Sequence, residues 1–222
     1  MRQVVLDTET TGIGAESGHR VIEIGCIELL DRQLTGRHYH TYLNPERAID
    51  PGAFKVHGIH EKFLADKPRF KDILSPFLDF IDQAELIIHN APFDVAFLNA
   101  ELKRAKHTQR VDACCTIFDT LTWARKKHPG QRNSLDALCK RYSITHFNRD
   151  LHGALLDAEI LAHLYLTMTG GQARLFNDDA TDNNNDLDQK NQFGIALSSN
   201  SPVVYANAEE LRAHDDFMRS LS

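Results

Sequence analysis

The chain of 222 residues contains no long apolar run and only four cysteines. No stretch approaches the roughly 18 apolar residues that a membrane-spanning helix needs, and the first residues enter a strand-like apolar run without the basic segment of a signal peptide. The cysteines show no C-x-x-C spacing, and two of them are adjacent, which suits a disulfide poorly. We therefore expect a cytoplasmic protein whose thiols are buried and reduced.

An excess of positive charge is also absent, since the formal net charge is −6. Such a balance argues against a protein that holds duplex DNA by electrostatic attraction alone. Residues 172–222 hold nine acids and four bases, which leaves 22 of the 31 acids and 21 of the 25 bases in residues 1–171. Two bound divalent cations would bring residues 1–171 to about +3. The composition is therefore compatible with weak, metal-assisted binding of nucleic acid.

The apolar pattern predicts strands near the N-terminus and alternating strands and helices after them. The first strand carries Val4, Val5 and Leu6, and two more strands with short links suggest an antiparallel meander. A loop opened by Pro51 and Gly52 follows. The further predicted segments are strands over 21–30 and 37–43 with a turn over 31–36, helices over 70–81, 90–102, 120–127, 133–142 and 153–169, and strands over 86–89 and 115–118. This order indicates an α/β fold whose mixed sheet combines an antiparallel meander with parallel strands and has helices on both faces.

The character of the chain changes after Gly171. Residues 177–202 include a run dense in Asn and Asp with almost no apolar side chains, so we predict a disordered acidic linker there. Residues 203–222 begin with a short apolar segment and include a predicted helix over 208–221. We expect residues 1–171 to form one domain and the rest to form a mostly disordered tail.

Two carboxylates follow the first apolar strand. Asp7 and Glu9 are two residues apart, so on a strand both point to the same face. Two like charges side by side repel each other, which a divalent cation between them would relieve. A D-x-E pair alone is equally compatible with a strand that ends in solvent, because short motifs match by chance.

Three residues from later in the chain decide between these interpretations. Asp94 lies in the first turn of a helix that follows a strand, at the carboxyl edge where open α/β sheets place their sites. Asp157 lies on the last predicted helix, and His152 precedes it by five residues. Taken singly, each fits a simpler role: an acid favoured by a helix dipole, a polar helix face, or a capping histidine.

Taken together, Asp7, Glu9, Asp94 and Asp157 form a set of four hard oxygen donors without cysteine. Such a set suits magnesium or manganese and disfavours zinc. Two such ions about 4 Å apart can hold a phosphodiester, one activating water and one stabilising the leaving oxygen. A histidine that titrates near neutrality can take the proton of the water. The set therefore predicts metal-dependent hydrolysis of a phosphodiester.

Three segments resemble the exonuclease motifs of the DEDD superfamily in order and spacing: DTETTG at 7–12, HNAPFD at 89–94 and HGALLD at 152–157. The histidine five residues before the last aspartate marks the histidine branch of that superfamily. Four further segments resemble the proofreading exonucleases of bacterial replicative DNA polymerases: VIEIG at 21–25, VHGI at 56–59, NSLDAL at 133–138 and MTGGQ at 168–172.

The resemblance implies a ribonuclease-H-like fold and a 3′→5′ exonuclease that removes the terminal nucleotide of single-stranded or frayed DNA as a 5′-monophosphate. It implies two divalent cations, Mg²⁺ or Mn²⁺, held by Asp7, Glu9, Asp94 and Asp157, with His152 as the general base. It places the 3′-terminal nucleotide against Asp7, Glu9, Thr10, Gly12, Gly52, His57, Asn90, Phe93 and Asp157. Phe93 equally fits a core position, and His57 equally fits a residue that fixes its loop.

The segment QARLF at 172–176 resembles the peptide that docks in the hydrophobic pocket of the bacterial sliding clamp, with Gln172, Leu175 and Phe176 as its contacts. A packing contact at a helix end explains these residues equally well, because five-residue motifs recur by chance. Residues 203–222 stand where relatives attach to the catalytic subunit of the polymerase. The resemblance leaves open whether a small accessory subunit binds the domain. Tethering would help a weakly binding nuclease, because effective concentration substitutes for affinity.

Two other functions stay open on the sequence. An exonuclease acting on RNA ends has the same motifs, although the clamp-like peptide and the long tail count against it. A non-catalytic replisome scaffold would keep the fold and lose the chemistry. The complete set of four acids and His152 argues against that second alternative.

Overall fold

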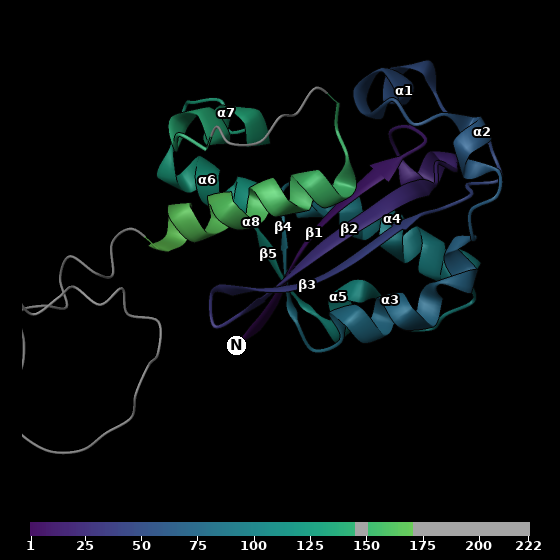
Figure 1. Cartoon of the computed structure of the whole chain (residues 1–222), viewed down its shortest axis with the longest axis horizontal. Coiled ribbons are helices and arrows are strands. Elements are labelled where there is room, and N and C mark those ends of the chain that lie inside the picture. The colour runs from purple at the N-terminus through teal and green to yellow at the C-terminus, as the bar shows by residue number, and fades with distance from the viewer. Residues whose placement is uncertain (145–150, 171–222) are drawn as a thin grey trace, which may run out of the picture. The chain divides into compact units, whose positions relative to one another are not determined.

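The computed structural model describes residues 1–144 and 151–170 (Figure 1). Within them, no helix is both long and apolar enough to cross a membrane. The predicted clamp-binding peptide at 172–176, the acidic linker at 177–202 and the tail segment at 203–222 lie outside the described residues.

The described domain is built on a five-stranded sheet in the order β3-β2-β1-β4-β5, with β1 at its centre. β1 pairs with β2 and β2 with β3 in antiparallel fashion, whereas the β1–β4 and β4–β5 pairs are parallel. The strands are β1 Arg2–Thr10, β2 Val21–Leu30, β3 Gln33–Tyr42, β4 Glu85–Ile88 and β5 Thr116–Asp119. The prediction of a mixed sheet with an antiparallel meander is confirmed.

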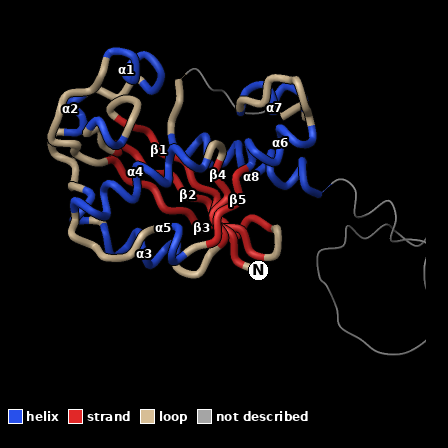
Figure 2. Tube along the Cα trace, turned by 180° about the vertical axis from the view of Figure 1, so that it is seen from behind, coloured by secondary structure: helices blue, strands red, loops and turns tan. Residues whose placement is uncertain are grey.

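Helices cover both faces of this sheet, and the alternation of side chains along β1 shows which helices cover which face. Val4 and Leu6 belong to an apolar cluster with α3, α4 and α5, whereas Val5 belongs to a cluster with α6, α7 and α8. Figure 2 shows the strands in red at the centre with the helices around them. The helices are α3 Leu74–Ile81, α4 Ala91–Arg104, α5 Val111–Cys114, α6 Thr120–Lys127, α7 Leu135–Arg141 and α8 Ala154–Gly170.

The segment predicted as a loop after Pro51 and Gly52 is a helix, α1 Pro51–His57, and this prediction was wrong. Pro51 occupies the first helical turn, where its missing N–H costs no helical hydrogen bond and its fixed φ suits the helix. Gly58 ends the helix in the left-handed conformation, with its N–H donating to the Phe54 carbonyl at 2.8 Å. The sequence suggested a loop because this short helix begins with Pro51 and Gly52 and is followed by Gly58, and proline and glycine are also the commonest turn residues.

Two predicted boundaries also differ from the structure. The link between β2 and β3 is the tight turn Asp31 and Arg32, both with positive φ, so β3 begins at Gln33 and not at residue 37. Such positive φ values give the turn the twist that a two-residue hairpin needs. The helix predicted over 70–81 is divided into the 3₁₀ turn η2 Phe70–Asp72 and α3. Pro76 divides it, because its ring would collide with the carbonyl of residue 72 in a continuous helix.

Three short elements were not predicted from the sequence. Each has fewer than five residues, which is too short for a periodic apolar pattern to be visible. They are η1 Ala15–Ser17, α2 Glu61–Leu64 and α5.

Helix α8 begins directly against β2 at Gly25. A Cβ atom at Gly25 would collide with the backbone of Ala154 and Leu155, so only glycine allows this approach. Gly25 is the cross-strand partner of Asp7 on β1. The close contact therefore sets the distance between the first turn of α8 and the middle of β1.

We expect Gly25→Ala to lower the free energy of unfolding by about 1–3 kcal/mol, the usual cost of overpacking, and to lower kcat because the first turn of α8 must move. Gly36→Ala is the control: its φ of 79° makes alanine unfavourable through the backbone alone, and no atom lies within 4 Å of the new Cβ. Thermal unfolding and turnover per folded molecule measure the two effects. A loss of kcat in both variants, or in neither, would contradict the positional role of Gly25.

Candidate active site

All four predicted acids and His152 line one cavity of about 550 Å³. Asp7 and Glu9 come from β1, Asp94 from the first turn of α4, and Asp157 from the first turn of α8. Residues separated by up to 150 positions thus meet where β1 and β4 end and two helices begin.

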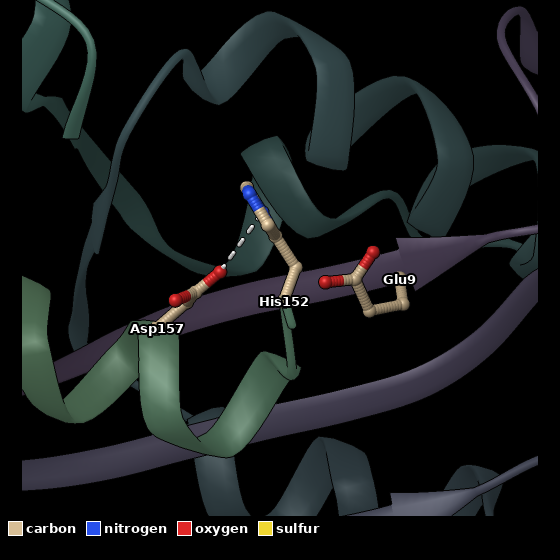
Figure 3. Close-up of side chains that lie close together, drawn as sticks. All are labelled: Glu9, His152 and Asp157. Atoms are coloured by element: carbon tan, nitrogen blue, oxygen red, sulfur yellow. Dashed lines mark ion pairs between the residues drawn. The ribbon is translucent and has the colours of Figure 1, made fainter. Parts of the chain in front are cut away.

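Glu9, His152 and Asp157 lie closest together (Figure 3). Each offers one ligand atom, and these atoms all lie within 4.8 Å of one another. His152 Nδ1 is 3.4 Å from Asp157 Oδ2. The backbone N–H of His152 donates to the Val56 carbonyl of α1 at 3.1 Å, which connects the residue before α8 to the opposite wall of the site.

Asp94 is deeply buried, with 3% of its surface exposed. Burial raises its pKa to about 7, and the negative charge of Asp119 adds to this. The Thr8 hydroxyl opposes the rise by donating to Asp94 Oδ1 at 2.7 Å. Asp94 therefore carries a full negative charge at neutral pH only if a positive charge is supplied nearby.

The donor chemistry of the cavity fits divalent cations. Its described lining holds five carboxylates, including the exposed Asp136, but only one guanidinium, Arg125, and no lysine. Hard oxygen ligands at a strand edge, with open volume in front of them, are the donors that Mg²⁺ and Mn²⁺ take.

A second cavity of about 440 Å³ adjoins the first and shares Thr8, Glu9 and Phe93 with it. Of the predicted nucleotide-binding residues, it brings together Thr10, Gly12, Gly52, His57 and Phe93. Asn90 lies instead on the first cavity, where it precedes α4 in a left-handed conformation.

Two of these residues have structural contacts as well. The ring of Phe93 packs against Phe97 with centroids 4.8 Å apart while it lines both cavities, so core packing and a site position are combined. His57 is buried, which lowers its pKa, and its Nδ1 accepts from the Ile59 N–H at 2.9 Å.

The sequence reasoning missed the residues that hold the second cavity in shape. His19 Nδ1 lies 3.0 Å from the Thr11 hydroxyl, and His19 Nε2 lies 3.5 Å from Asp50 Oδ2. The Asp50 N–H donates to the Thr11 carbonyl at 2.9 Å. Gly12 sits within this group, and any side chain there would strike His19. No local pattern signals such contacts, because they join the end of β1 to the start of α1.

Thr8 was missed too, although alternation along β1 points to it. Because Asp7 and Glu9 face one side of the strand, Thr8 faces the other, where α4 brings Asp94. Arg125, Gln131 and Asn133 of the α6–α7 region were also not predicted as lining residues.

The chain is similar to known exonucleases over most of its length. The model of the RNase_T family, described as an exonuclease, matches residues 4–165. DNA polymerase III subunit epsilon of Pasteurella multocida is 50% identical over 226 residues, covering 100% of this chain and 89% of that protein. The Escherichia coli protein of the same name is 48% identical over 220 residues, covering 96% and 90%.

Solved structures of exonucleases share the fold. Exonuclease X in complex with 5′-overhanging duplex DNA aligns with a TM-score of 0.57 at 26% identity, covering 77% of this chain and 95% of that one. The nuclease domain of 3′hExo, a DEDDh family member bound to rAMP, aligns with a TM-score of 0.65 at 17% identity, covering 75% and 90%. The second likeness concerns the fold alone.

Asp94 makes the stability of the metal-free protein depend on pH. The pKa of Asp94 is about 7 in the folded protein and about 3.9 in the unfolded chain. Its contribution to the free energy of unfolding is therefore fully present below pH ~4 and is lost as the pH rises through 7. In chelator, Asp94→Asn should therefore reduce the fall in Tm between about pH 5 and pH 8. Thr8→Val should steepen that fall, because it removes a hydrogen bond that favours the charged form. If Tm falls equally with pH in the wild type and in both variants, the raised pKa of Asp94 is contradicted.

Proposed function

The chain belongs to the RNase_T exonuclease family, and we propose on that premise that it is the proofreading 3′→5′ exonuclease of a bacterial DNA polymerase III. The observation that carries this conclusion is the identity of 48–50%, over 96–100% of the chain, to proteins named DNA polymerase III subunit epsilon. The function expected from the three motifs is thereby confirmed. The substrate is the 3′ end of single-stranded or frayed DNA, and the product is a 5′-monophosphate.

The two alternatives lose their support. The relatives at high identity over the full length are polymerase subunits, whereas the structure with rAMP is similar in fold only. A scaffold without chemistry would not need four acids and a histidine around one cavity.

The two cavities would bind different parts of the substrate. The second cavity would hold the terminal nucleoside between Thr10 and Gly12 on one side and Gly52 and His57 on the other. Phe93, which borders both cavities, would contact the terminal base or sugar. The scissile phosphate would then lie over Glu9, at the boundary that the cavities share.

The acids and the histidine would carry the chemical step. Asp7, Glu9, Asp94 and Asp157 would hold two divalent cations, Mg²⁺ or Mn²⁺, which supply water activation and stabilise the leaving oxygen. Because Nδ1 of His152 faces Asp157, its Nε2 would take the proton of the attacking water. The water oxygen forms the new bond to phosphorus, the P–O3′ bond breaks, and the departing 3′ oxygen receives a proton from solvent.

Hydrolysis of DNA labelled at the 3′ end tests this function. With Mg²⁺ or Mn²⁺ the wild-type protein should release labelled 5′-monophosphate, and chelator should abolish it. Asp7→Ala with Glu9→Ala should lower the rate to the chelator background while the thermal melt changes little, because two repelling carboxylates are removed. A double variant that cuts at the wild-type rate would refute the metal assignment. The same assay on labelled RNA measures the alternative substrate.

Association with the replicative polymerase follows from the same relatives, and the individual contacts are proposals. Residues 203–222 would bind the catalytic subunit, and Gln172, Leu175 and Phe176 would dock in the sliding clamp as a short peptide ligand. Tethering at both places would raise the effective concentration of the nuclease at the primer end.

Leu175→Ala with Phe176→Ala should weaken binding to the purified clamp by about tenfold or more, because two apolar anchors of a peptide are removed. Activity on free single-stranded DNA serves as the internal control, since neither residue belongs to the three exonuclease motifs. Surface plasmon resonance measures the affinity for the clamp. An unchanged affinity in the double variant would reject the docking motif.

A further inference from the structure

Positive charge is concentrated in one segment of the domain. Residues 120–141, which comprise α6, the connecting loop and α7, hold six bases and one acid. Residues 1–171 hold 22 acids and 21 bases in all, so outside this segment 21 acids face 15 bases. The segment therefore has the opposite sign to the rest of the domain.

Part of this basic segment opens onto the active-site cavity. Leu121 and Arg125 of α6 line that cavity, together with Gln131 and Asn133 of the loop. Lys126 and Lys127 lie on a different hollow with Trp123. Arg125 is exposed, and within residues 1–144 and 151–170 it forms no hydrogen bond or ion pair.

Hydrogen bonds hold the loop between α6 and α7 in shape. Asn133 is 8% exposed, and its amide donates to the carbonyls of His128 at 3.2 Å and Gln131 at 2.9 Å. Arg141 donates to Asn133 Oδ1 at 3.3 Å and to the Arg132 carbonyl at 3.0 Å. The loop therefore presents Gln131 on the cavity of the carboxylates, with the exposed Arg132 beside it in the chain, on a fixed frame as a binding surface requires.

Two exposed arginines outside this segment are already paired with acids. Arg110 bonds to Asp112 at 2.9 Å, and Arg69 bonds to Glu46 at 2.9 Å. The second cavity has neither lysine nor arginine among the described residues that line it. It therefore suits a neutral nucleoside, and the phosphates of a bound strand must lie against a different surface that carries positive charge.

We propose that the strand upstream of the terminal nucleotide leaves the carboxylates across the α6–α7 region, with its phosphates over Arg125, Arg132 and Arg141. This inference rests on the proposed function, and it assigns the path that the upstream part of the DNA strand takes across the domain. In both views α1, on the nucleoside cavity, and α7 lie on opposite sides of the start of α8 (Figures 1 and 2). Asp136 is the one acid of this segment, and three guanidinium groups outweigh its charge.

The size of this surface agrees with weak binding that relies on tethering. Each phosphate contact to a single strand contributes about 0.7 to the slope of log affinity against log salt, so three contacts give a slope of about −2. Such binding guides a frayed strand but does not hold it for long.

The test compares Arg125→Gln, Arg132→Gln and the double variant with Lys103→Gln. Lys103 is an exposed base on α4 that lines a different hollow with Pro92. Lys103→Gln therefore removes one positive charge, as each arginine variant does, but outside the α6–α7 segment. KM and kcat are measured in the full chain with Mg²⁺, on 3′-labelled strands from about twelve nucleotides down to two, at several salt concentrations.

Each arginine variant should raise KM severalfold on long strands, with the change in KM and not in kcat, and should reduce the salt slope by about 0.7. The increase in KM should shrink as the strand is shortened, whereas Lys103→Gln should follow the wild type. An equal effect of Lys103→Gln, an increase in KM independent of strand length, or no increase in KM would overturn the proposal. If the wild type cuts no strand at all, the proposed function fails, which is a distinguishable outcome.

Discussion

Repulsion among carboxylates is the constraint around which this domain is organised. Asp7, Glu9, Asp94 and Asp157 come from three elements and line one cavity, where the described basic groups are few. Burial adds a further cost at Asp94, because it raises the pKa of this carboxyl to about 7, with a smaller contribution from the charge of Asp119. Divalent cations bound by these acids would relieve the repulsion, and they would also supply the water activation that phosphodiester hydrolysis needs. A site that is unfavourable when empty is therefore ready to bind the ions that its chemistry needs.

The scaffold keeps these acids in place by close contacts between the elements that carry them. Gly25 lets the start of α8 touch β2 next to Asp7. On the other face, Arg20 forms a bidentate pair with the buried Glu101 of α4 at 2.6 and 2.8 Å, and so ties the start of β2 to the helix that carries Asp94. A buried ion pair adds little net stability, but breaking it leaves a buried charge, so it favours one arrangement of α4 over others. Position, more than stability, is what these contacts supply.

The charge distribution separates two kinds of recognition. In the proposed arrangement, a cavity without lysine or arginine among its described lining residues would take the terminal nucleoside, and an arginine-bearing surface on the other side would take the phosphates that follow. Because such a surface offers few contacts, we expect its affinity for free DNA to be low, so that attachment to the polymerase would substitute for it through effective concentration. A proofreading nuclease benefits from this division, since a strand that binds only briefly returns to the polymerase after cleavage.

Local patterns in the sequence determined the elements, the shared face of Asp7 and Glu9, and the motifs that identify the family, because alternation and helical spacing act over a few residues. They failed where the signal was short or ambiguous: Pro51 and Gly52 begin a helix, and Pro76 divides one. Only the tertiary structure decided which distant groups meet. The bond from Thr8 to Asp94, the packing of His19 around Gly12 and the exposure of Arg125 beside the acids depend on how sheet and helices pack. Such contacts join residues tens of positions apart, and no period within one strand or helix records them.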